Sequence, residues 1–196
     1  MLDVRAVQCK LLRRRGAEPL MKLEETAIGG AFLVTPEATV DARGFFARIW
    51  CAREFAQAGL DARLAQCSLS FNHRCGTLRG LHYQRAPYAE GKLVRCIRGR
   101  LWDVIVDLRE TSPTFRQWRA VELSQENRLA LFVPEGVAHG FQTLVDNTEV
   151  LYQMTEFFVS EASAGVRFDD PQLAIPWPIA HKIVSERDQA LGFLPT

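Results

Sequence analysis

Short apolar runs separated by turn residues recur roughly every 8–12 residues from Met21 onward, a spacing typical of all-β domains. These runs predict strands at residues 31–34, 44–50, 92–97, 101–108, 118–123, 129–133, 141–144 and 149–158. A short helix is predicted at 52–59, where Gly59 can end it. Because no long segment has a period of about 3.6 residues, the pattern predicts a sandwich or barrel, and a double-sheet jelly roll is one standard form.

The clearest pair of predicted strands, 92–97 and 101–108, is joined by Arg98-Gly99-Arg100. Glycine adopts a positive φ at little cost, and tight hairpin turns require that conformation. We therefore expect these two strands to form a hairpin around Gly99.

Both ends of the chain depart from this pattern. Residues 1–20 are basic and lack the apolar stretch and cleavage site of a secretory signal, so we expect a disordered extension. Residues 21–196 are then predicted to form one domain. From Pro171 onward several prolines predict an irregular strap with one short helix.

Composition narrows the class of protein. The chain has 196 residues and a net charge of +1, which argues against a nucleic-acid binder because such proteins are usually strongly basic. No apolar run approaches about 18 residues, so no membrane span is expected. The five cysteines are an odd number without a C-x-x-C pair, which favours reduced thiols in the cytoplasm over disulfides or structural zinc.

The densest polar segment runs from residue 76 to 84 and holds Arg79 and His82. On a regular strand His82 would share a face with Gly80, and Arg79 would point to the other face unless the glycines bend the chain. A plain structural interpretation is a core histidine bonded to a backbone carbonyl, with the arginine at the surface.

A second histidine, His139, raises the question of a metal. Cupin-type jelly rolls often bind iron or manganese through a His-x-His pair, a glutamate and a distant histidine. Neither His82 nor His139 has a histidine two positions away, and the chain has four histidines in all. We therefore expect no metal, although a metal-dependent cupin enzyme stays as an alternative.

Asp103 and Asp107 alternate with valines on one predicted strand, so both side chains can point inward. Buried carboxylates need partners. The structural interpretation is a pair of salt bridges with Arg95 or Arg109.

Three other positions carry candidate polar groups. Lys92 opens a strand ten residues after His82, and Tyr152 lies in the middle of another strand. By default Tyr152 is a core tyrosine with a satisfied hydroxyl, and residues 185–188 are a helix cap followed by solvated charges.

Together these segments resemble the dTDP-4-dehydrorhamnose 3,5-epimerase family. Nine landmarks follow one another in family order between about residue 22 and residue 190. They are Asp41-x-Arg43-Gly44-Phe45-Phe46, the segment 76–84, Lys92-Leu93-Val94, Gly99-x-x-x-Asp103-Val104-x-Val106-Asp107, Ser112-Pro113-Thr114-Phe115, Pro134-x-Gly136-x-Ala138-His139-Gly140-Phe141, Asp169-Asp170-Pro171, Trp177-Pro178 and Ser185-x-x-Asp188. The resemblance implies a metal-free cupin-type jelly roll, or double-stranded β-helix, with short peripheral helices. It also implies a homodimer that exchanges N-terminal strands.

The resemblance implies four catalytic residues. His82 matches the family's general base, and Asp188 matches the carboxylate that orients it. Tyr152 matches the tyrosine that delivers a proton to the opposite face of the sugar. Lys92 matches the lysine beside the C4 oxygen.

It also implies a binding site for the nucleotide. Arg79 and Arg187 resemble residues that contact the diphosphate. Arg43 and Phe46 match residues that line the nucleotide site from the partner subunit. His139 matches a second site histidine.

The implied substrate is a nucleotide-diphosphosugar, dTDP-linked, with a 4-keto-6-deoxy sugar that is inverted at C3, C5 or both. A ketone makes the neighbouring C–H bonds acidic, so a histidine base, a cation at the C4 oxygen and a second acid are the groups required. The ketone is the electron sink, so no cofactor is expected. A non-catalytic sugar-nucleotide-binding jelly roll stays as a further alternative.

The chain departs from the family pattern at three places. Arg48 stands where the family often has a glutamate, and Phe158 replaces a tyrosine that stacks on the nucleotide base. The loop 70–75 is longer than in the standard rhamnose enzymes. All three lie on the nucleotide side, and none is one of the four catalytic positions.

Overall fold

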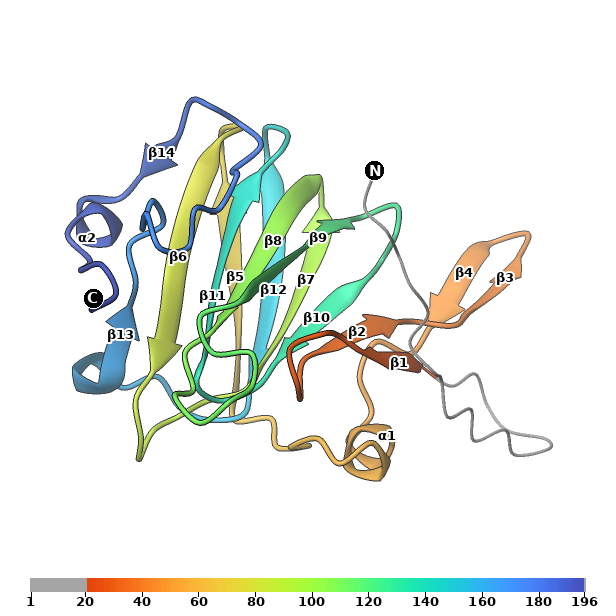
Figure 1. Cartoon of the computed structure of the whole chain (residues 1–196). Coiled ribbons are helices and arrows are strands. Elements are labelled where there is room, and N and C mark those ends of the chain that lie inside the picture. Colours follow the sequence, from red (N-terminus) through yellow and green to blue (C-terminus); the bar gives the residue numbers. More distant parts are fainter. Residues whose placement is uncertain (1–20, 196) are drawn as a thin grey trace.

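The computed structural model describes residues 21–195, in which two β-sheets lie face to face (Figure 1). The first sheet has the strand order β1 (Lys22–Glu25), β2 (Phe32–Thr35), β10 (Ala130–Val133), β7 (Lys92–Arg98), β12 (Thr148–Met154) and β5 (Gln66–Asn72). The second has the order β13 (Ser163–Gly165), β6 (Thr77–Gln84), β11 (Val137–Thr143), β8 (Arg100–Asp107) and β9 (Trp118–Ser124), and β14 (Ile183–Val184) pairs with β6 in parallel. This arrangement confirms the predicted all-β jelly roll.

Short elements lie at the periphery of the two sheets. They are the hairpin β3 (Ala38–Asp41) and β4 (Gly44–Ala47), the helices α1 (Ala52–Gln57) and α2 (Glu186–Gln189), and the 3-10 helix η1 (Ser160–Ala162). The helix predicted at 52–59 is confirmed, and Gly59 follows it with a φ of +76°.

None of the helices in residues 21–195 is long and apolar enough to cross a membrane. The predicted extension, residues 1–20, lies outside the described residues.

The main core lies between the two sheets. Val94, Cys96 and Leu131 of the first sheet meet Ile105 and Phe141 of the second, and each is at most 2% exposed. These residues alternate with outward-facing positions along their strands, as the period of two requires. Burial of a large apolar side chain stabilises a fold by about 1.5–3 kcal/mol, so this layer holds the sheets together.

Two further apolar layers cover the outer faces of the sheets. Phe55 of α1 packs against Phe132 on the first sheet, with ring centroids 5.8 Å apart. The strap after Pro171 places Leu173 and Ile175 against Val104 on the second sheet. The strap is therefore part of the packed structure, and it carries α2 back toward β6 (Figure 1).

The predicted hairpin around Gly99 is wrong. Gly99 has the expected positive φ of +75°, but β7 lies in the first sheet and β8 in the second. The chain crosses from one sheet to the other at this glycine, so β7 and β8 face each other across the core. Both strands are apolar enough to be buried at the centre of a sheet, and each gains two strand neighbours this way.

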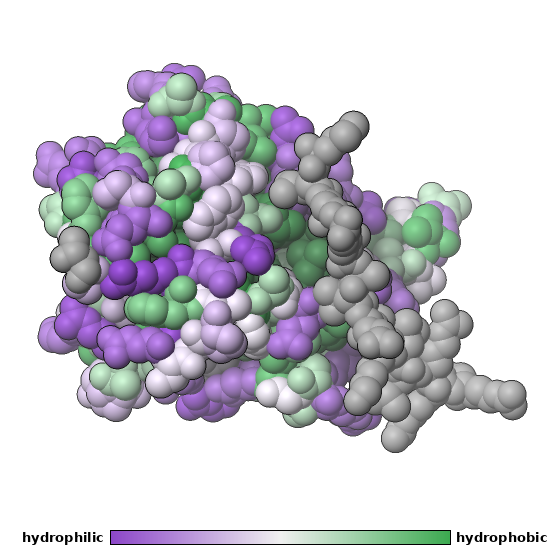
Figure 2. All heavy atoms as spheres, viewed as in Figure 1, coloured by the Kyte–Doolittle hydropathy of each residue, from purple (hydrophilic) through white to green (hydrophobic). Residues whose placement is uncertain are grey.

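The β3–β4 hairpin projects from the body of the molecule, and apolar side chains show at its surface (Figures 1 and 2). Val40, Phe45 and Phe46 are between 52% and 77% exposed. Its two strands pair with each other in a separate two-stranded sheet. These three side chains form an exposed apolar surface on the hairpin.

Candidate active site

A cavity of about 510 Å³ opens between the two sheets. Side chains from β5, β6, β7, β11, β12 and the C-terminal strap line it. Eight of the ten predicted site residues lie there, namely Arg79, His82, Lys92, His139, Tyr152, Phe158, Arg187 and Asp188.

Strand β6 is bent so that Arg79 and His82 both face the cavity. Gly80 has a φ of +128°, and the pairing register between β6 and β11 shifts beside it. A Cβ atom at Gly80 would lie 2.5 Å from the Cα of Gly140, so only glycine fits at this crossing. The glycines thus bring to one site two side chains that a regular strand would separate.

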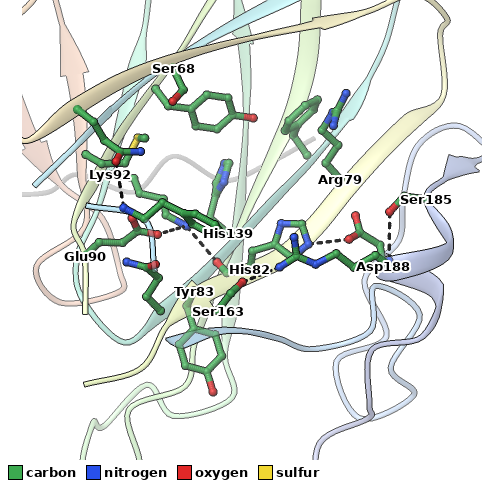
Figure 3. A pocket seen from close by; sticks show the side chains of 17 residues that line it. Ser68, Arg79, His82, Tyr83, Glu90, Lys92, His139, Ser163, Ser185 and Asp188 are labelled. Carbon is green, nitrogen blue, oxygen red and sulfur yellow. Dashed lines mark hydrogen bonds and ion pairs between the residues drawn. The ribbon is translucent and has the colours of Figure 1, made fainter. Parts of the chain in front are cut away.

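The ring of His82 is paired with the carboxylate of Asp188, which lies 106 positions away in α2. The distance from His82 Nε2 to Asp188 Oδ1 is 2.8 Å (Figure 3). The other carboxylate oxygen accepts a hydrogen bond of 3.1 Å from the Gly80 amide. The structural interpretation, a core histidine bonded to a carbonyl, is therefore wrong, and about a third of the side chain is exposed.

Asp188 is held in place at the first turn of α2. Its amide donates to the Ser185 hydroxyl, which caps the helix, at 3.1 Å. Burial raises the pKa of this carboxyl, but hydrogen bonds from His82, Gly80 and Ser185 outweigh that effect and lower it. Asp188 therefore stays ionised beside the imidazole at neutral pH.

Lys92 places its ammonium group in the cavity from the start of β7. Its Nζ lies 2.9 Å from Glu90 Oε1 and donates to the carbonyl oxygen of His82 at 3.5 Å (Figure 3). Both charged side chains are nearly buried. Sequence reasoning missed Glu90, although an acidic residue two positions before the lysine was a readable signal.

A second histidine–aspartate pair is buried in the cavity wall, where His139 lines the cavity and Asp103 is fully buried. His139 Nε2 is 2.7 Å from Asp103 Oδ1, and burial raises the pKa of Asp103 although His139 opposes this. The predicted salt bridge of Asp103 with Arg95 or Arg109 is wrong. In the β8–β11 register His139 pairs with Ile105, two positions from Asp103 on the same face of β8, so His139 is the partner of Asp103. The salt bridge between Asp107 and Arg109 is confirmed at 2.8 Å.

Tyr152 lines the opposite wall, on β12 of the first sheet. Its ring meets the edge of the His139 ring with centroids 6.2 Å apart. Burial raises the pKa of Tyr152, and the charge of Asp103 adds to this, while a hydrogen bond from Ser70 and the charge of Arg79 oppose it. The phenol therefore keeps its proton at neutral pH.

Two arginines give one part of the cavity a positive charge. Arg79 Nε donates to Asn72 Oδ1 at 2.9 Å, and Arg187 Nη2 donates to the Ser163 hydroxyl at 2.7 Å. Phe158, also on the cavity wall, is 54% exposed. An apolar ring and two guanidinium groups on the wall of one cavity suit a ligand with an aromatic part and an anionic part.

Arg43 and Phe46 do not line the cavity. They lie on the β3–β4 hairpin, where Arg43 pairs with Asp41 and Phe46 is 77% exposed. Arg48, one of the departures from the family pattern, forms an ion pair of 2.8 Å with Glu54 of α1.

The arrangement places an imidazole and a phenol on opposite walls. His82 reaches the cavity from the second sheet, and Tyr152 reaches it from the first. Among residues 21–195 no three His, Cys, Asp or Glu side chains are grouped so that they could hold a metal ion. The groups present can remove a proton from one face of a bound molecule and return one to the other face.

Residues 25–195 match the family described as dTDP-4-dehydrorhamnose 3,5-epimerase. The chain is 41% identical over 171 residues to the dTDP-4-dehydrorhamnose 3,5-epimerase of Sinorhizobium fredii, covering 87% of this chain and 88% of that protein. It is 38% identical over 170 residues to a dTDP-4-dehydrorhamnose 3-epimerase of Streptomyces niveus, covering 86% and 82%. A crystal structure of the Bacillus anthracis 3,5-epimerase with TDP and PPi bound is 42% identical, with a TM-score of 0.87 and coverage of 89% of this chain and all of that one.

Proposed function

The chain belongs to the dTDP-4-dehydrorhamnose 3,5-epimerase family, and we propose that it inverts C3, C5 or both in a dTDP-linked 4-keto-6-deoxysugar. The observation that carries this proposal is the placement of His82 and Tyr152 on opposite walls of one cavity. The C4 ketone acidifies the hydrogens on both neighbouring carbons. Loss of either hydrogen gives an enolate, so the substrate supplies its own electron sink.

His82 is the base in this proposal. Because Asp188 is ionised it can only accept, so Nε2 of His82 carries the hydrogen of their 2.8 Å bond. The lone pair of Nδ1 is then free to take a proton from carbon. Asp188 stabilises the imidazolium that forms, which is the orienting role that a carboxylate plays in a catalytic triad.

Lys92 stabilises the enolate. Negative charge develops on the C4 oxygen as the proton leaves, and a cation already in place lowers the energy of that state. Glu90 and the His82 carbonyl hold the ammonium group at 2.9 and 3.5 Å, so it needs little reorganisation during the reaction. The lysine is thereby tied to the strand that carries the base.

Tyr152 returns the proton. Its raised pKa keeps the phenol protonated, and its wall faces the one that holds His82. Removal on one face followed by protonation on the other inverts the carbon. Arg79 and Arg187 are the groups proposed to hold the diphosphate, which agrees with the TDP and PPi bound in the Bacillus anthracis relative.

A second copy of the chain completes the nucleotide site in this proposal. Arg43 and Phe46 are exposed on a hairpin that leaves the body, so they reach a cavity only in another molecule. Mixing His82→Ala with Arg43→Ala subunits tests this. Heterodimers then hold one intact site, so activity should return to about one quarter of the normal value, as random pairing predicts. No recovery in a mixture shown to exchange subunits contradicts the shared site.

We place the reaction in a reducing compartment such as the cytoplasm. The four cysteines in residues 21–195, Cys51, Cys67, Cys75 and Cys96, are all free thiols. Unpaired cysteines are typical of proteins that work where thiols stay reduced.

The test of the reaction is solvent exchange. The protein is incubated with dTDP-4-keto-6-deoxyglucose in D2O, and NMR follows deuterium at C3 and C5 together with the configuration of the product. Deuterium at either carbon with inversion supports the proposal, and the labelled position tells C3 from C5 chemistry. Absence of exchange with this and related nucleotide 4-ketosugars overturns it.

A further inference from the structure

The two arginines of the cavity are held by neutral side chains. Arg79 Nε donates to the amide oxygen of Asn72 at 2.9 Å, and Arg187 Nη2 donates to the Ser163 hydroxyl at 2.7 Å (Figure 3). Both arginines line the cavity and both are exposed. Within residues 21–195 neither forms an ion pair, so each presents a positive charge that no carboxylate partner offsets.

Arginines elsewhere in the molecule are held differently. Four of them pair with an aspartate two positions away, namely Arg43 with Asp41, Arg63 with Asp61, Arg109 with Asp107 and Arg167 with Asp169. A carboxylate fixes the orientation of a guanidinium group and at the same time offsets its charge. The neutral partners in the cavity fix the orientation without supplying a negative charge.

Asn72 is a rigid acceptor at the end of β5. It is 2% exposed, and its amide nitrogen donates to the Thr148 carbonyl at 3.1 Å. This bond determines which end of the amide carries the oxygen, so the oxygen faces Arg79 Nε. Thr148 is fully buried and lies opposite Asn72 in the β5–β12 register. The sheet therefore sets the position of the acceptor.

The bond at Nε leaves the outer edge of the Arg79 guanidinium available. A guanidinium group binds phosphate through two parallel N–H groups, and Nη1 and Nη2 form such a pair. No hydrogen bond to another residue in 21–195 occupies them. Ser163 lies on β13, which pairs with β6, so Arg187 is also anchored to a sheet. A cation that is already positioned loses less conformational entropy when a ligand binds.

We propose that Asn72 and Ser163 are positioning residues that aim Arg79 and Arg187 at the diphosphate of the substrate and leave the charge of both arginines uncompensated. This inference rests on the proposed function, in which the two arginines hold the diphosphate. An anionic ligand gains more from an uncompensated cation than from one already paired with a carboxylate. Because the diphosphate is bound equally before and during the reaction, the two residues set affinity and not the rate of the chemical step.

The test measures the Kd of dTDP by titration calorimetry and, separately, kcat and KM with the 4-ketosugar. Asn72→Ala removes the acceptor, so Kd and KM should rise roughly tenfold while kcat stays within about twofold. Asn72→Asp keeps an acceptor oxygen on a side chain of the same size and adds a negative charge beside Arg79. It should weaken dTDP binding more than Asn72→Ala does, whereas a merely structural role predicts the opposite order.

Ser163 provides an independent pair of variants. Ser163→Ala should raise the Kd of dTDP about threefold or more, and Ser163→Thr, which keeps the hydroxyl, should restore it. These variants test the proposal even if the buried Asn72 variants do not fold. Asn147→Asp is the matched control, because it makes the same change of charge on the exposed turn between β11 and β12, and its Kd should equal that of the unmodified protein.

Unchanged dTDP affinity in Asn72→Ala and Ser163→Ala overturns the positioning role, and so does a loss of kcat without a rise in KM. If Asn72→Asp binds dTDP as tightly as the unmodified protein, the role of the uncompensated charge is overturned. Arg79→Ala with unchanged affinity also overturns the inference, because Arg79 then does not hold the diphosphate. Failure of the proposed function is seen in a different assay, as absence of deuterium exchange by the unmodified protein, so the two failures are distinguishable.

Discussion

Two histidine–aspartate pairs each contribute a histidine to the cavity wall, and they differ in their surroundings. The distances are nearly equal, 2.8 Å for His82–Asp188 and 2.7 Å for His139–Asp103. His82 is about a third exposed and its aspartate has both oxygens bonded. His139 is 5% exposed, and Asp103 is fully buried with Oδ2 lacking a partner among residues 21–195.

The surroundings give the two aspartates opposite pKa directions. Donors around Asp188 overcome its burial and lower its pKa, whereas burial dominates at Asp103 and raises it. A carboxylate that is ionised and fully bonded can stabilise an imidazolium next to open space. The comparison teaches that geometry alone does not make a base, because solvent access and the remaining hydrogen bonds decide which pair can exchange protons with a substrate.

The largest expected effect comes from removing the accessible imidazole. His82→Asn should lower deuterium incorporation by roughly 10³–10⁴-fold because no other group is placed to take the proton. The matched variant His139→Asn should lower it by no more than about tenfold. NMR in D2O measures the exchange rates of both variants. Equal losses in His82→Asn and His139→Asn would contradict the different roles assigned to the two pairs.

The next effect concerns the carboxylates. Asp188→Asn should lower kcat on the order of 10²–10³-fold with little change in KM, because an amide that donates to Nε2 leaves the hydrogen on Nδ1. Asp103→Asn should lower kcat far less. Steady-state kinetics of both variants test this, and a larger loss in Asp103→Asn would reverse the assignment of the base.

Tyr152 lies against the ring of His139, the histidine of the buried pair, so a variant at Tyr152 tests the comparison further. Tyr152→Phe should form inverted product about 100-fold more slowly because the acid on the far wall is lost. Deuterium incorporation should persist because His82 can still remove a proton and return a deuteron to the same face. Product configuration and label are measured together. Equal loss of both signals contradicts a separate acid.

The smallest effect is the pH dependence of stability. A lowered folded pKa, as at Asp188, stabilises the fold above the ordinary carboxyl pKa, and this is lost as the pH falls. A raised folded pKa, as at Asp103, has the opposite sign, so its stabilising contribution is lost as the pH rises. Asp103→Asn should therefore become less destabilising as the pH rises from 4 to 7, whereas the destabilisation by Asp188→Asn should shrink as the pH falls below about 4, the ordinary range of the carboxyl pKa. Urea unfolding at several pH values measures this, and slopes of the same sign would contradict the assignment.

Local patterns predicted most elements but not how the strands are shared between sheets. The strands at 118–123 and 129–133 and the helix at 52–59 lie within one or two residues of the observed elements. The Gly99 turn was predicted in its conformation but not in its role, because a positive φ serves a hairpin and a crossing between sheets equally well. Which of the two forms depends on the partners of each strand, and these come from distant parts of the chain.

The same limit applies to the site. Asp103 was identified as an inward carboxylate from alternation alone, yet its partner His139 follows from a strand register that no local pattern contains. Glu90 and Ser68, which also line the cavity, were missed. The alternation of Ser68, Ser70 and Asn72 was a readable signal of a polar inner face on that strand.

The sequence by itself determined the all-β class, the glycine positions, the inward carboxylates and the family, because alternation, turn chemistry and motif order are properties of neighbouring residues. The tertiary structure decided that Asp188 meets His82 across 106 positions, that Tyr152 faces them from the other sheet, and that Arg43 and Phe46 stay outside the cavity. The physical reason is that reactivity depends on distance, burial and solvent access. Those quantities exist only after strands remote in the chain have packed together.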